Sequence, residues 1–139
     1  MDNQKKEKFI YDLDVLRALV DIEISRISRY GKEGAFSIAF IYSPTVSTLE
    51  NDETALASMI KNNLRSSDVL SAVEKDFAFV FLPETDEKGT KEFLRRMKEK
   101  LPSDTITGYV TYPEDGTNSF DIFQKLMKDM QTKLLLSEE

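Results

Sequence analysis

Residues 69–83 read VLSAVEKDFAFVFLP. Two apolar runs, 69–73 and 77–82, flank a charged turn at residues 74–76. Short runs of aliphatic and aromatic residues on either side of a tight polar turn are typical of a β-hairpin. Pro83 closes the second run, because proline lacks the backbone N–H that a strand ladder requires. The stretch therefore predicts two antiparallel strands in the middle of the chain.

The segment before this hairpin predicts a helix followed by a buried strand. A helix is expected from about Lys8 to Tyr30, because apolar residues recur there every three or four positions. These residues are Phe9, Leu13, Leu16, Val20, Ile24 and Ile27. Gly31 and Gly34 are expected to end the helix. The apolar run Ala35–Tyr42 then predicts a buried strand.

The apolar face of this first helix has two interpretations. We favour packing on the domain's own sheet, because the repeat is too short for a coiled coil. The alternative is a dimerising or signalling helix, which would make the protein a homodimer.

Four further elements are expected around the hairpin. Asn51 or Asp52 is expected to cap a helix that continues to about Leu64. A helix over 86–101 carries inward apolar residues at Phe93, Leu94, Met97 and Leu101. A strand over 106–112 and a helix over 120–135 follow it.

The order of elements predicts an α/β (α+β) fold. The order is α-β-α-β-β-α-β-α, so two crossovers flank a central hairpin. This gives a mainly antiparallel sheet flanked by helices, as in ferredoxin-like and polymerase-palm folds. We expect a single domain over 1–139, with an N-terminal helix in 1–31 and a core in 35–135.

Composition excludes several kinds of chemistry. The chain of 139 residues has a net charge of −6 and contains neither cysteine nor histidine. Catalysis by Ser-His or Cys-His pairs and most transition-metal sites are therefore excluded. The negative charge argues against binding to a nucleic-acid polymer. No apolar run is long enough to span a membrane and no signal peptide is recognisable, so we expect a cytoplasmic protein.

Four segments resemble segments of the GGDEF domain of bacterial diguanylate cyclases. They occur in the same order as in that family and at nearly the same spacing. They are residues 23–31, 64–69, 81–86 and 108–116, and the resemblance covers most of residues 20–133. It implies that the family signature falls on Glu74, Lys75, Asp76, Phe77 and Ala78.

The resemblance also implies that catalytic residues are lost. The two signature glycines become Glu74 and Lys75, whose side chains would fill the space where substrate approaches the backbone. The metal-binding acidic residue becomes Phe77, and a second metal position becomes Tyr42. The chain is also shorter than the family between Tyr42 and Arg65. We therefore expect no catalytic residue, no bound metal or cofactor, and no enzymatic activity.

A regulatory site of the family has better-matched positions. Arg65-Ser66-Ser67-Asp68 matches its Arg-x-x-Asp core, and a further arginine of that site falls on Arg96. The neighbouring Arg95 could substitute for Arg96. In relatives this site binds cyclic di-GMP. Arginine can meet guanine O6 and N7 or a phosphate, and a carboxylate can accept from the guanine N–H groups. The plainer interpretation is an exposed connection in which Arg65 pairs locally with Asp68.

Two functions follow as hypotheses. The first is a cyclic di-GMP receptor that binds through Arg65, Asp68 and Arg96 and passes its occupancy to a protein partner in a signalling pathway. The second is an interaction domain without a ligand, which docks through the first helix or the hairpin tip. An enzyme of another kind is disfavoured, because no pair of convergent carboxylates is apparent.

Overall fold

The computed structural model describes residues 2–30, 34–46 and 54–137 of the chain. The elements are α1 (Asp2–Arg29), β1 (Phe36–Tyr42), α3 (Ala55–Lys61), β2 (Val69–Ser71), β3 (Phe77–Pro83), α4 (Glu87–Lys100), β4 (Ile106–Tyr112) and α5 (Ser119–Ser137). Their order is the predicted one, and the α/β class is confirmed.

The strands form one antiparallel sheet in the order β2-β3-β1-β4. The central strand β1 pairs with β3 along its whole length, from Phe36 opposite Pro83 to Tyr42 opposite Phe77. On its other side, β1 pairs with β4 from Phe36 opposite Tyr112 to Tyr42 opposite Ile106. This is the predicted palm-type arrangement, with β2 and β4 at the two edges.

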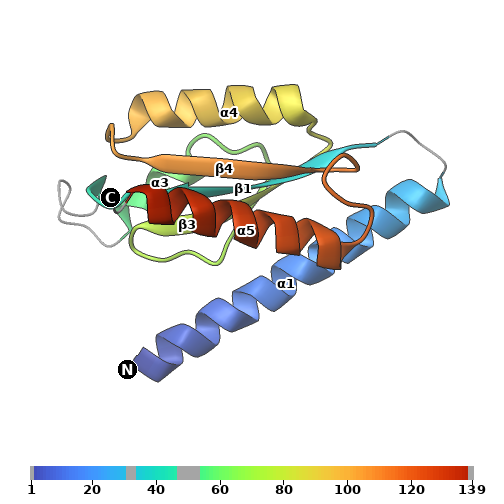
Figure 1. Cartoon of the computed structure of the whole chain (residues 1–139), viewed down its shortest axis with the longest axis horizontal. Helices are drawn as coiled ribbons and strands as arrows, with labels where there is room; N and C mark the ends of the chain where they lie inside the picture. The colour runs from blue at the N-terminus through green and yellow to red at the C-terminus, as the bar shows by residue number, and fades with distance from the viewer. Residues whose placement is uncertain (1, 31–33, 47–53, 138–139) are drawn as a thin grey trace.

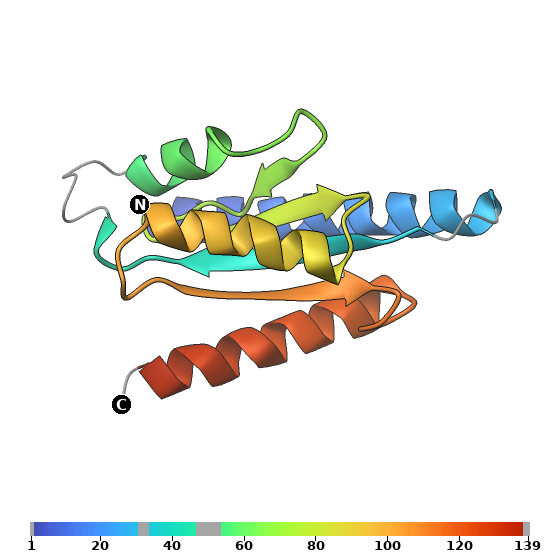
Figure 2. The ribbon, with the colours of Figure 1, turned by 90° about the horizontal axis from the view of Figure 1, so that it is seen from above.

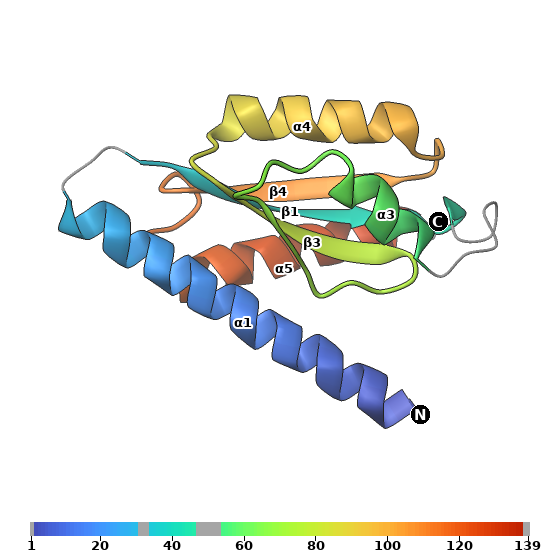
Figure 3. The same cartoon turned by 180° about the vertical axis from the view of Figure 1, so that it is seen from behind.

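Helices cover both faces of the sheet (Figures 1 and 2). Helices α1 and α5 pack on one face, and α3 and α4 pack on the other, as the view from behind also shows (Figure 3). Successive side chains of a strand point to opposite faces, so β1 serves both layers. Phe36, Ile38 and Phe40 enter the first core, and Ala39 and Ile41 enter the second.

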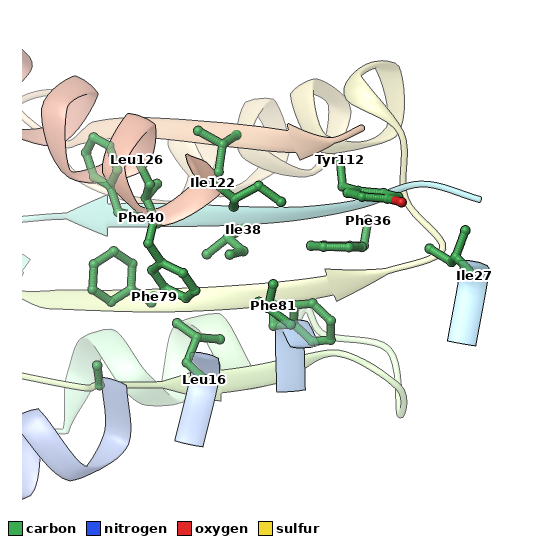
Figure 4. Packing of buried hydrophobic residues seen from close by; sticks show 14 residues of the cluster. Leu16, Ile27, Phe36, Ile38, Phe40, Phe79, Phe81, Tyr112, Ile122 and Leu126 are labelled. Atoms are coloured by element: carbon green, nitrogen blue, oxygen red, sulfur yellow. The ribbon is translucent and has the colours of Figure 1, made fainter. Parts of the chain in front are cut away.

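The core under α1 and α5 is rich in aromatic rings (Figure 4). The ring of Phe36 stacks on Tyr112 with centroids 5.0 Å apart and lies 5.5 Å from the ring of Phe81. Helix α1 contributes Leu16, Val20 and Ile27 to this core, all of them buried. The apolar face of the first helix thus packs on the domain's own sheet, as we favoured.

The core under α3 and α4 includes a cluster of buried hydroxyl groups. The hydroxyl oxygen of Ser37 lies 2.9 Å from that of Thr111 and 2.6 Å from that of Thr90. The Ser37 hydroxyl also lies 3.2 Å from the carbonyl oxygen of Thr85. Buried polar atoms must be paired, and these contacts pair them within the cluster. The cluster therefore joins β1, β4 and the start of α4.

Several boundaries differ from the predicted ones for local physical reasons. Strand β2 ends at Ser71, because Ala72 takes a left-handed backbone (φ 51°) that leaves the ladder. Helix α3 ends at Lys61, three residues early, where the N–H of Leu64 turns back to the Lys61 carbonyl. Helix α1 begins at Asp2, before the expected start.

The structure describes the N-terminal cap of α4 but not the predicted cap of α3. Asp86 precedes α4 as its cap, and its carboxylate accepts a hydrogen bond from the N–H of Gly89 at 2.8 Å. The proposed caps Asn51 and Asp52, and also Gly31, lie outside the described residues. In the part of the chain that the structure describes, no helix has both the length and the apolarity needed to cross a lipid bilayer.

Candidate functional site

Arg65 and Asp68 contact each other in the connection between α3 and β2. The Arg65 Nη2 atom lies 2.8 Å from Asp68 Oδ1, and Nε lies 3.2 Å from both carboxylate oxygens. The backbone N–H of Arg65 donates to Asp68 Oδ2 at 2.9 Å, and the N–H of Asp68 donates back to the Arg65 carbonyl. The sequence-predicted pair is therefore brought together as mutual partners.

The two members of this pair differ in exposure. The side chain of Asp68 is 2% exposed, whereas that of Arg65 is 54% exposed. The carboxylate is thus covered by the arginine, while much of the guanidinium faces solvent. Hydrogen bonding to Asp68 raises the pKa of Arg65, so the arginine stays charged at any ordinary pH.

Arg65 also reaches the end of β3. Its Nη2 atom donates to the carbonyl oxygen of Pro83 at 3.0 Å and to the Thr85 hydroxyl at 2.6 Å. Because Thr85 also offers its carbonyl oxygen to the buried Ser37 hydroxyl, the guanidinium is linked to the hydroxyl cluster inside the sheet.

A pocket of about 510 Å³ opens beside Arg65. It lies where the end of α1, the start of β1, the end of β3 and the start of α4 meet. Its lining residues are Arg26, Ile27, Gly34, Ala35, Arg65, Glu84, Thr85, Asp86 and Gly89. Two guanidinium groups and two carboxylates therefore surround one hollow, and this can bind a ligand with both anionic and hydrogen-bond-donating groups.

Arg26 is the pocket residue that sequence reasoning missed. Its guanidinium pairs with Glu23 one turn earlier in α1 and lies 3.9 Å from the carboxylate of Glu84. Hydrogen bonding to Glu23 raises the pKa of Arg26. An arginine three residues after a glutamate resembles an ordinary exposed helix pair, so only the folded arrangement reveals that it faces the pocket.

Arg96, the third predicted residue, does not line this pocket within the described part of the chain. It is exposed on α4, about two helical turns after Gly89 and about 10 Å further along the helix axis. Residues seven apart lie on the same helix face, so Arg96 lies on the face that carries Gly89. The structure therefore groups Arg65, Asp68 and Arg26, with Arg96 further along α4.

The opposite end of the sheet carries the five residues that the resemblance assigns to the signature. Glu74 and Lys75 are exposed at the hairpin tip, where the N–H of Glu74 donates to the Phe77 carbonyl at 2.7 Å. The carbonyl of Asp76 accepts from the Ser43 N–H at 2.8 Å, and Ala78 is buried. Tyr42 lies directly across the ladder from Phe77.

Aromatic packing dominates this end of the sheet. The Phe77 ring is edge-on to Phe79, with centroids 4.9 Å apart, and stacks with Phe40 at 6.3 Å. Asp76 is the one carboxylate of the five aligned residues that matches an acidic signature position. The described residues include no group of three or more acidic side chains placed to hold a metal ion.

Comparison with known proteins identifies a structural likeness at low sequence identity. No family profile matches the sequence, and no curated protein is significantly similar to it. The GGDEF domain of YfiN (TpbB) from Pseudomonas aeruginosa superposes with a TM-score of 0.69 at 13% identity and covers 86% of each chain. A sensory box/GGDEF family protein from Caulobacter crescentus gives 0.61 at 16% identity, covering 90% of each chain.

A DGC protein from Thermotoga maritima gives a TM-score of 0.63 at 17% identity, covering 83% of this chain and 91% of that one. Identities this low establish the fold and leave the chemistry to the residues of this chain. The chain has a GGDEF-like palm fold, and the family resemblance of its sequence is matched at the level of structure.

Proposed function

We propose that the chain is a catalytically inactive GGDEF-like signalling domain that binds cyclic di-GMP at the pocket beside Arg65. The observation that carries the proposal is the convergence of Arg65 and Arg26 on one hollow of about 510 Å³. Two arginines from separate elements suit a ligand that combines guanine bases with phosphates.

Arg65 supplies the first contact in this proposal. Its exposed guanidinium offers a planar fork to guanine O6 and N7 or to a phosphate. If the fork turns outward, it also uncovers the Asp68 carboxylate, which can then accept from guanine N1–H and N2–H. In this proposal Arg96, about two turns after Gly89 on α4, contacts the second half of a dinucleotide that extends along the helix.

The proposed lack of cyclase activity depends on the hairpin tip. Phosphoryl transfer with divalent metal requires carboxylates that hold the ions on both sides of the transferred group. Tyr42 and Phe77 occupy the two aligned positions, and they face each other across the β1–β3 ladder. Neither side chain can bind Mg²⁺ in place of a carboxylate.

Calorimetry with cyclic di-GMP tests the receptor proposal. We expect binding at micromolar affinity or better to the wild type, and a loss of at least tenfold in Arg65→Ala and Arg26→Ala, since each removes a charge-assisted contact. Arg96→Ala should weaken binding, whereas Lys128→Ala, at an exposed position on α5 that does not line the pocket, serves as the control. Absence of binding at high ligand concentration would contradict the proposal.

Incubation with guanosine triphosphate and Mg²⁺ tests the inactivity separately. We expect no cyclic di-GMP by chromatography, because the metal positions lack carboxylates. Any product formed by wild type, and absent from an Asp76→Ala variant, would contradict the proposed inactivity without bearing on the receptor site.

A ligand-free interaction domain is the second candidate, and one observation favours it. Both carboxylate oxygens of Asp68 accept hydrogen bonds from Arg65, which also bonds to the Pro83 carbonyl. The pair can therefore have a structural role, in which it holds the α3–β2 connection against β3. In that case Arg65→Ala lowers the stability of the domain. Cyclic di-GMP then raises the melting temperature of neither the wild type nor the Arg65→Ala variant.

A further inference from the structure

A second hollow, of about 360 Å³, runs over the edge of the sheet between α4 and β4. Four basic residues line it, together with an apolar and hydroxyl-bearing floor: Lys91, Arg95, Lys98 and Lys133, with Leu94 and Tyr109. No carboxylate is among the described residues that line it. Four cations around one groove are unexpected in a chain whose net charge is −6.

The ion pairs of these cations are exposed and exchangeable. Lys91 lies 3.3 Å from Glu87, and Lys133 lies 3.2 Å from Asp129. Arg95 pairs with Glu92 at 2.6 Å and with Glu99 at 2.5 Å. Among the described residues, Lys98 takes part in no ion pair. Exposed pairs of this kind contribute about 0–1 kcal/mol each, so an incoming carboxylate can replace a partner at little cost.

The floor of the groove is the edge strand β4, and both ends of that edge are already occupied. The N–H of Thr111 donates to the Asp115 carboxylate at 2.8 Å, and the Thr111 carbonyl accepts from the Asp115 N–H. The carbonyl of Thr107 accepts from Lys133 Nζ at 3.3 Å. These groups therefore point away from β1.

Tyr109 lies between these two residues with the same orientation. In an antiparallel pair, residues two apart share the direction of their backbone groups, so the N–H and C=O of Tyr109 also point outward. No hydrogen bond within the described residues engages this outward pair. Tyr109 thus offers one donor and one acceptor with the spacing that a neighbouring strand would use.

We propose that this groove binds an acidic, extended segment of a partner protein, which adds to the edge of β4 at Tyr109. Alternate side chains of an added strand point to opposite faces of the sheet. Carboxylates on the α4 side would meet Lys91, Arg95 and Lys98, and the side chains between them would point toward α5.

The backbone pairing is the reason for choosing a peptide over a nucleic acid. A polynucleotide could use the cations, but it has no strand of amide groups to pair with Tyr109. The closed ends of β4 restrict the added strand to a short segment centred on one residue. The basic residues would then attract the acidic segment to the groove, and the backbone groups of Tyr109 would set the register of the added strand on β4.

Fluorescence anisotropy with a labelled peptide of alternating glutamate and valine tests the proposal. We expect saturable binding that weakens at least tenfold in K91E/K98E, because the groove changes sign. K75E/K128E is the matched control, since it makes the same charge change at exposed positions outside the groove. A peptide with lysine in place of glutamate should not bind.

Tyr109→Pro tests the backbone contact separately from charge. Proline removes the outward N–H and is tolerated at the solvent side of an edge strand, so we expect at least a tenfold loss of peptide affinity. Tyr109→Phe keeps the N–H and should bind as wild type does. If the proline variant fails to fold, the hydrogen-exchange rate of the wild-type Tyr109 amide replaces it, and the peptide should slow that rate.

Any one of several results would overturn the proposal. They are absence of saturable binding to the acidic peptide, an equal loss in K75E/K128E, and equally tight binding of a single-stranded oligonucleotide of the same charge. Unchanged exchange of the Tyr109 amide at saturating peptide would also contradict it, because the strand would then not be paired.

Discussion

The two ends of the central strand β1 differ in chemistry. At the Phe36 end, Arg65 and Arg26 border an open pocket, and Asp68 pairs with Arg65. At the Tyr42 end, about 20 Å away along the strand, aromatic rings pack where the resemblance places metal-binding residues. One end therefore carries charged groups beside a hollow, whereas at the other end aromatic rings pack against the core.

This difference shows that the two ends of one sheet can carry side chains suited to different roles. The same strands run through both ends, so the fold alone does not determine which end binds a ligand. The side chains at each end determine its role. The aromatic rings at one end contribute to stability, and the guanidinium groups at the other end are held in place by hydrogen bonds to neighbouring residues. Mutations at each end should therefore have different effects on stability and binding.

Phe77→Ala should give the largest effect on stability. The half-buried ring contacts Phe40 and Phe79, and its removal should lower the free energy of unfolding by about 2.5 kcal/mol in urea titration. Phe120→Ala, at a 71% exposed position, should change it by less than about 0.5 kcal/mol. Equal effects of the two changes would show that the tip is not part of the core.

Asp68→Ala should come next, at the pocket end. Removal of a buried carboxylate leaves the Arg65 N–H and guanidinium without their main acceptor, which should cost about 2 kcal/mol of unfolding free energy. Ser67→Ala, at the exposed neighbouring position, is the control for urea titration. An Asp68→Ala effect as small as that of Ser67→Ala would mean that the pair behaves as an ordinary surface salt bridge.

Thr90→Val should lower the free energy of unfolding by a smaller amount. The Thr90 side chain links the start of α4, beside the pocket, to the sheet. The Thr90 hydroxyl contacts the Ser37 hydroxyl at 2.6 Å and the Asp86 carbonyl at 2.8 Å. Its replacement by a methyl group should cost about 1 kcal/mol in thermal or urea unfolding, because the partners stay buried. No loss would indicate that Ser37 finds full compensation in Thr111 and Thr85.

Glu84→Gly should give the smallest change, and in the opposite direction. Glu84 borders the pocket with a left-handed backbone (φ 52°), which disfavours any residue with a Cβ atom. Glycine should raise the unfolding free energy by about 0.5 kcal/mol, since relief of strain is partly offset by entropy of the unfolded chain. Glu84→Ala keeps the Cβ atom and should show no such gain.

Much of the fold could be predicted because the sequence pattern reports burial. The stripe at Phe93, Leu94, Met97 and Leu101 lies inward as expected, and β4 has its predicted bounds. The end of β2 could not be predicted, because a left-handed alanine at position 72 has no sequence signal. The predicted α3 is too long, because the helical spacing of apolar residues extends to Leu64, whereas the helix ends at Lys61.

The candidate site was predictable only where its residues are adjacent in sequence. Arg65 and Asp68 are three residues apart, so a short motif could identify them. Arg26 lies far away in the chain and reaches the pocket because α1 crosses the sheet, which no local pattern encodes.

Helix α1 connects the pocket to a distant point in space. It has 28 residues and so extends about 42 Å, with its first turns beyond the sheet (Figures 1 and 3). Arg26 lies near one end of this rod, and Leu16 and Val20 hold its middle in the core. A tilt of about 5° around the pocket end would displace the far tip by about 3 Å. The length of α1 would thus turn a small rotation beside the pocket into a displacement of a few ångströms at its first turn.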